Sequence, residues 1–186
     1  MSRASGGPKL SPVGAVTRGL AAGAVGTLAM DLVWFARYKR GGGDQGFWAW
    51  ETGANVKGWD DVSAPGQVGR RLAQGFLQRE LPEEWARPLN NVVHWVYGTG
   101  WGAQYGVVAG SIRRRPWWSA PVFASVVWLS GYVVLPIAKV YRPLWEYDAK
   151  TLARDASAHA AYGAATTAAF GVLERLTPDG RAGADD

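Results

Sequence analysis

Cysteine is absent from this chain of 186 residues, and histidine occurs only twice. The lack of cysteine excludes disulfides, thiolate metal sites and cysteine nucleophiles. The sequence also has no nucleophile elbow, no phosphate-binding glycine loop and no paired His-Glu zinc motif. It therefore gives no reason to expect an enzyme of these classes.

Charge is scarce in four stretches, each of which is long enough to cross a bilayer. At a rise of about 1.5 Å per residue, each stretch covers the roughly 30 Å hydrocarbon layer. The predicted spans are residues 13–35, 89–112, 117–138 and 152–173. Apart from tyrosines, their ionisable residues are Arg18, Asp31, His94, Arg154, Asp155 and His159. The pattern predicts an all-α protein, a four-helix transmembrane bundle that forms a single integral membrane domain over residues 1–186.

Tryptophan is abundant, with 11 residues, and several of them lie near the ends of the predicted spans. Indole rings favour the headgroup layer of a membrane. These residues are Trp34, Trp95, Trp117, Trp118 and Trp145. The alternative is a soluble Ala/Gly-rich helical bundle, since the second and fourth stretches are weakly apolar and the mean hydropathy is −0.11. We favour the membrane because a soluble core would bury its tryptophans more centrally.

The formal net charge is +5, and the basic residues flank the predicted spans. They form no basic stripe of the kind that binds nucleic acid, so the expected partner is the lipid bilayer. The Arg113-Arg114-Arg115 triplet occupies a short turn between the second and third spans. By the positive-inside rule it indicates that both termini lie in the cytoplasm.

The connection between the first two spans, residues 36–88, is the only sizeable segment outside the predicted membrane region. Gly41-Gly42-Gly43 is expected to end the first helix. Ser63-Ala64-Pro65 then begins an amphipathic helix that runs to about Glu80 and packs on the bundle or on the lipid surface. The aromatic residues of the connection, among them Trp59, are expected on the membrane surface.

The second and fourth spans share one pattern. In each, a histidine is followed at +3 by Tyr, at +4 by Gly, at +11 by an aromatic residue and at +12 by Gly. The two copies start at His94 and His159. The identical spacing predicts an internal duplication of a two-helix hairpin, with the second and fourth spans parallel.

Small residues recur every four positions along these two spans, a glycine-zipper spacing that lets membrane helices approach closely. The glycines expected to serve helix packing are Gly98, Gly102, Gly106, Gly110, Gly163 and Gly171. The same ridges would serve packing within one chain or between the chains of a homo-oligomer.

Both histidines and two aspartates are expected at a similar depth in the bilayer, as one cluster of Asp31, His94, Asp155 and His159. Charged groups inside spans normally pair and face the bundle interior. One interpretation is a hydrogen bond that only fixes the helices of a scaffold or interaction protein. A second is proton or cation handling, or pH sensing, because histidine titrates near neutrality. A third is a cofactor site for haem or a divalent metal.

The run Gly26-Thr27-Leu28-Ala29-Met30-Asp31 ends on an aspartate inside the first span. With its span count and glycine-rich helices, the chain resembles uncharacterised small bacterial inner-membrane proteins and is distantly similar to the YagU family. That resemblance implies a role in acid resistance. It carries over no catalytic residues.

Overall fold

The structure, a computed structural model, describes residues 10–112, 116–137 and 139–176. Over these residues it is all helical and contains no strand, which confirms the predicted class. The elements are α1 (Pro12–Arg40), α2 (Phe47–Glu51), α3 (Ala64–Leu77), η1 (Glu83–Trp85), α4 (Ala86–Ser111), α5 (Ser119–Ile137), η2 (Leu144–Glu146) and α6 (Ala149–Leu176). The basic triplet on which the predicted orientation depends lies outside the described residues.

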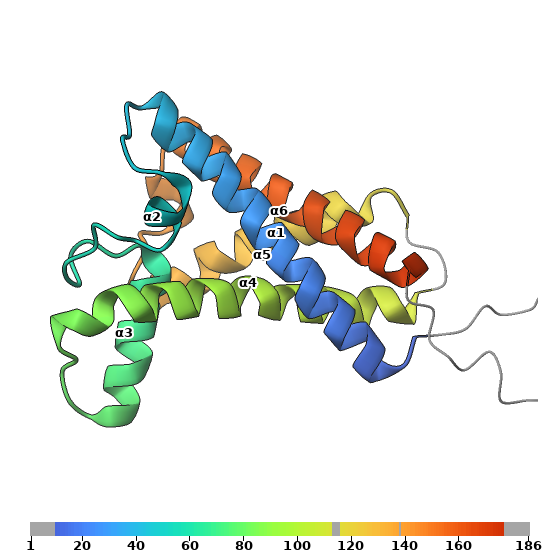
Figure 1. Cartoon of the computed structure of the whole chain (residues 1–186), viewed down its shortest axis with the longest axis horizontal. Helices are drawn as coiled ribbons and strands as arrows, with labels where there is room; N and C mark the ends of the chain where they lie inside the picture. The colour runs from blue at the N-terminus through green and yellow to red at the C-terminus, as the bar shows by residue number, and fades with distance from the viewer. Residues whose placement is uncertain (1–9, 113–115, 138, 177–186) are drawn as a thin grey trace, which may run out of the picture.

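The four long helices α1, α4, α5 and α6 overlap the four stretches that were predicted as spans. Helix α1 lies between α4 and α6 and runs opposite to both, while α5 packs on α6 (Figure 1). Within the described part of the chain, α1 and α5 are long and apolar enough to cross a membrane. Helices α4 and α6 do not reach the same hydropathy.

The ends of α1 follow from local chemistry. The Ser11 hydroxyl accepts a hydrogen bond from the Gly14 backbone N–H at 3.1 Å, and Pro12 occupies the first turn, where a missing N–H costs nothing. The helix ends at Arg40, before the predicted glycines. Gly42 has a φ of +89°, which a residue with a side chain adopts only with strain.

Small residues bring α1 and α4 into close contact where they cross. A Cβ atom added to Gly106 would lie 2.9 Å from the Cα of Gly19, closer than real side chains come. Each successive contact is four residues forward in α1 and four backward in α4, and we call this series the α1–α4 ladder. Its contacts join Ala15 to Gly110, Gly19 to Gly106, Gly23 to Gly102 and Thr27 to Gly98.

Helix α6 packs on the other side of α1 and on α5. Tyr162 is buried, and its hydroxyl donates a hydrogen bond to the carbonyl oxygen of Gly98 in α4 at 2.6 Å. Gly163 faces Ala124 of α5, whereas a Cβ added to Gly171 would meet nothing within 4 Å. The glycine ridge of α4 therefore packs on α1, and α6 reaches α4 through the Tyr162 side chain.

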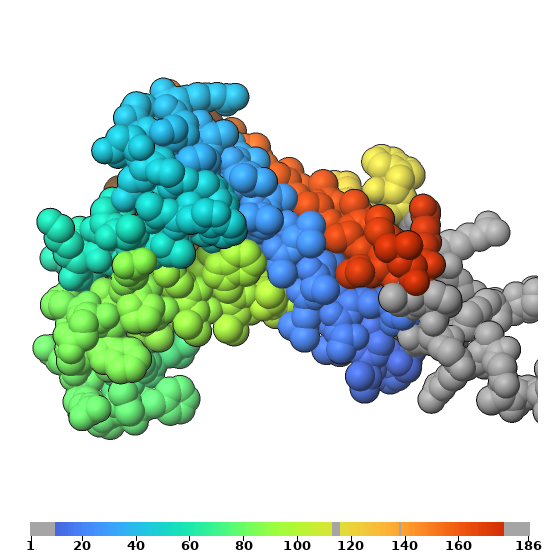
Figure 2. Space-filling view, viewed as in Figure 1, coloured from blue at the N-terminus to red at the C-terminus, as the bar shows by residue number. Residues whose placement is uncertain are grey.

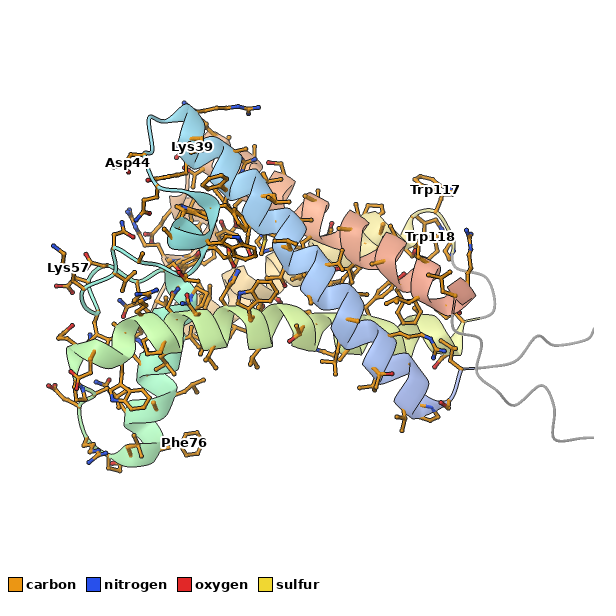
Figure 3. The ribbon with its side chains drawn as sticks, in the orientation of Figure 1. Lys39, Asp44, Lys57, Phe76, Trp117 and Trp118 are labelled. Atoms are coloured by element: carbon orange, nitrogen blue, oxygen red, sulfur yellow. The ribbon has the colours of Figure 1, made fainter. Side chains whose placement is uncertain are left out.

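The connection folds back on α4. Helix α3 lies against the start of α4, where Gly66 and Gly69 face Asn90, Leu89 and Val93. It ends at Leu77, three residues before the predicted end, because Gln78 turns into a left-handed conformation with a φ of 54°. The Phe76 side chain is 87% exposed and projects from α3 into open space (Figure 3).

Trp59 corrects one expectation, because it does not lie on the surface. Its side chain is 1% exposed and packs with Val62 and Ala86 in a small core of the connection. The indole Nε1 donates to the Leu81 carbonyl at 3.1 Å, and the backbone N–H donates to the Glu83 carboxylate at 2.7 Å. With its polar group bonded inside the protein, the ring has no need of the headgroup layer.

Candidate functional site

The α1–α4 ladder ends in a histidine–aspartate pair. One step beyond Thr27 and Gly98, Asp31 of α1 faces His94 of α4, and His94 Nε2 lies 3.0 Å from both carboxylate oxygens. The Asp31 side chain is 6% exposed and that of His94 is 25% exposed. The pair thus joins a buried carboxylate to an imidazole that still reaches the surface.

Helix α2 fills the fork that opens between α1 and α4 beyond this pair (Figures 1 and 2). Two of its aromatic rings pack on Phe35 of α1, with centroids 5.2 Å away for Phe47 and 5.4 Å away for Trp50. Its far end is bonded to α4: the Thr52 carbonyl accepts from Arg87 Nε at 2.8 Å and from Asn91 Nδ2 at 2.9 Å.

This anchoring brings a third ionisable group to the pair. Glu51, the last residue of α2, is half-buried, and its Oε1 accepts a hydrogen bond from Trp95 Nε1 at 3.1 Å. Ligand atoms of Asp31, Glu51 and His94 all lie within 4.8 Å of one another. Burial, followed by the nearby Asp31 carboxylate, raises the pKa of Glu51.

The sequence did not predict Glu51 as part of the site. Helix α2 has five residues, which is too short for a helical period to show which side of it faces the bundle. The one available signal is the run of aromatic residues around Glu51, which indicates a segment that packs on something.

Asp155 and His159, which we expected in one cluster with Asp31 and His94, instead form a separate group with side chains of α5. His159 Nδ1 lies 3.4 Å from an Asp155 carboxylate oxygen and 3.1 Å from the Asp155 carbonyl oxygen one turn earlier. The other Asp155 oxygen accepts from Trp128 Nε1 at 3.0 Å and from the Tyr132 hydroxyl at 2.9 Å. In the described structure no hydrogen bond or ion pair joins this pair to Asp31 and His94.

No known protein identifies the site. No family model matches this chain, and no curated protein or solved structure is similar enough to count as a match. Any functional argument therefore rests on the side chains themselves. The similarity to the YagU family stays a prediction.

The two groups differ in the chemistry they offer. Each imidazole is bonded to a different carboxylate, an arrangement that does not favour haem held between the two histidines. Asp155 already accepts two hydrogen bonds from α5, which suits a structural role. The group of Asp31, Glu51 and His94 combines two carboxylates with one imidazole from three helices. Such a set can hold a proton or a cation.

Proposed function

We propose that this chain is an integral protein of a bacterial cytoplasmic membrane, with four spans built from two duplicated hairpins and both termini in the cytoplasm. The support comes from the outer surface of α1 and α5. Only 33% and 22% of the residues in their most apolar windows are buried, whereas the core helix of a soluble protein is mostly buried. The lipid bilayer is the partner that would cover these faces.

The side chains at the two ends of the long helices fit this placement. Trp117 and Trp118, just before α5, point outward at one end, where indole rings suit the headgroup layer (Figure 3). Lys39, Asp44 and Lys57 lie at the opposite end (Figure 3). Helix α3 projects from the side of the bundle there, where its exposed Phe76 would meet the membrane surface.

Within this membrane protein, we propose that the Asp31–His94 pair handles protons or cations. The observation that carries the proposal is the contact itself: a buried aspartate in α1, 3.0 Å from a partly exposed imidazole in α4. Ionisable groups inside membrane-spanning helices are costly to bury, and they mark ion pathways or proton relays. The predicted likeness to the YagU family adds acid resistance as the physiological setting.

Proton flux in liposomes under an imposed pH gradient tests this function. We expect wild-type protein to dissipate the gradient, and Asp31→Asn and His94→Gln to abolish the flux, because each removes one of the two proton-binding groups. His159→Gln is the matched control, since it changes the same residue type at the equivalent place of the other hairpin. All proteins are compared at equal incorporation.

Each pattern of flux has a defined meaning. Loss of flux in His94→Gln alone assigns the pathway to the Asp31–His94 pair, and loss in both histidine variants assigns it to both pairs. Equal flux in every variant, or none in wild type, would leave the pair as a structural contact of a membrane scaffold.

A further inference from the structure

We propose that Asp31, Glu51 and His94 together bind one divalent transition-metal ion, with zinc, manganese and ferrous iron as the fitting class. The inference deepens the proposed function, because it names a cation for the same site. It adds Glu51, which the proton-handling argument does not need.

The distances allow one ion to reach all three side chains. Atoms that share a metal at about 2.0–2.2 Å can lie no more than roughly 4.4 Å apart. The three candidate ligand atoms already lie within 4.8 Å of one another. A movement of the half-buried Glu51 carboxylate by a few tenths of an ångström closes the difference between these two distances, while α1 and α4 stay in place.

The donor types select the class of metal. An imidazole nitrogen with carboxylate oxygens suits zinc, manganese and iron, whereas calcium and magnesium prefer oxygen ligands alone. Cuprous copper prefers thiolate or thioether sulfur, and this chain has no cysteine and two methionines. Two carboxylates also balance the charge of a divalent ion, which matters where water is scarce.

The surroundings hold the ligands ready. The Trp95 indole N–H donates to Oε1 of Glu51 at 3.1 Å, and one oxygen of the same carboxylate lies within 4.8 Å of the Asp31 and His94 ligand atoms. Hydrogen bonds to a ligating carboxylate fix its orientation and strengthen metal binding. Arg87 and Asn91 donate to the carbonyl of Thr52, the next residue, and these bonds hold the backbone of Glu51 beside α4.

The test is equilibrium binding to purified protein in detergent, without a polyhistidine tag, because a tag binds the same ions. We expect zinc to bind with one-to-one stoichiometry and cobalt to give the visible absorption of a coordinated ion. Magnesium should give neither signal. Glu51→Gln should weaken zinc binding at least tenfold. This variant retains an oxygen that accepts from Trp95, so its fold is preserved.

Glu84→Gln is the control, since Glu84 is an exposed acidic residue of η1. Asp31→Asn is a second test, and it should weaken binding as Glu51→Gln does. Absence of one-to-one binding in wild type, or equal binding in wild type and Glu51→Gln, would overturn the proposal. A loss that is as large in Glu84→Gln would overturn it as well.

The metal site and proton conduction can fail separately. Metal binding without proton flux would refute proton conduction and leave the metal site standing. Proton flux without metal binding would refute the metal site and leave proton conduction standing.

Discussion

Asp148 shows how a single side chain stabilises a helix in this protein. Its carboxylate accepts hydrogen bonds from the Thr151 backbone N–H at 2.9 Å and from the Thr151 hydroxyl at 2.6 Å, so it caps the start of α6. These bonds, that of the hydroxyl first, hold the pKa of Asp148 below its ordinary value of 3.8. The stabilisation is therefore complete at neutral pH and is lost as the pH falls through the lowered pKa.

Two substitutions of Asp148 separate the cap from its charge. Asp148→Ala removes the acceptor, and we expect the unfolding temperature in detergent at pH 7 to fall by roughly 2–4 °C. Asp148→Asn keeps an acceptor that does not titrate, so its unfolding temperature should decline less than that of wild type in acid. An alanine variant that unfolds at the wild-type temperature would show that the cap contributes nothing.

At the scale of helices, the α1–α4 ladder depends on the absence of side chains. A Cβ atom at Gly102 would meet the backbone of α1 at Gly19 and Gly23, where backbone cannot move aside without separating the helices. We expect Gly102→Ala to lower the free energy of unfolding by about 1–3 kcal/mol. Thermal or denaturant unfolding in detergent measures this loss.

Gly100 provides the control on the same helix. A Cβ added there would meet nothing within 4 Å, and alanine is the better helix former by up to about 1 kcal/mol. Gly100→Ala should therefore leave stability unchanged or raise it slightly. Equal effects of the two substitutions would mean that the glycines act through helix propensity and not through the contact with α1.

The sequence predicted these helices better than their contacts. Apolar runs and the glycines after Arg40 were sufficient to place the long helices, because those signals are local. The four-residue spacing of glycines in α4 indicated a close approach but could not name α1 as the partner. Ala15, Gly19 and Gly23 carry the same spacing, and only the fold shows that the two series face each other.

The candidate site was half predictable for the same reason. Asp31 and His94 stand out as ionisable groups within long apolar stretches, so composition reveals them. Glu51 belongs to a connection where acidic residues are ordinary. Its place in the site depends on contacts of α2 with two helices that are distant in the sequence, and no pattern in one segment records such contacts.

At the scale of the whole molecule, the number of spans decides on which side the exposed loops lie. With four spans, Lys57 before α3 and Lys150 at the start of α6 face the same side of the membrane. If only α1 and α5 cross, Lys150 faces the opposite side. Both lysines are exposed, and the chain has no cysteine, so Lys57→Cys and Lys150→Cys each introduce a single reactive thiol.

We expect a membrane-impermeant maleimide to label both variants from the same side of intact membranes. The wild-type chain, which has no thiol, is the unlabelled control. Labelling of Lys150→Cys from the opposite side would support two spans in place of four. Release of the protein from membranes by alkaline carbonate would instead support the soluble bundle.

The regular step of the α1–α4 ladder also determines where the chain tolerates changes of length. One residue inserted into an α-helix rotates everything beyond it by about 100°. An insertion between Ala15 and Asp31, or between His94 and Gly110, would turn the rest of that series away from its partner and separate the aspartate from the histidine. Away from the ladder positions these two segments can therefore exchange residues, but neither can gain or lose a residue without breaking both the helix contact and the pair.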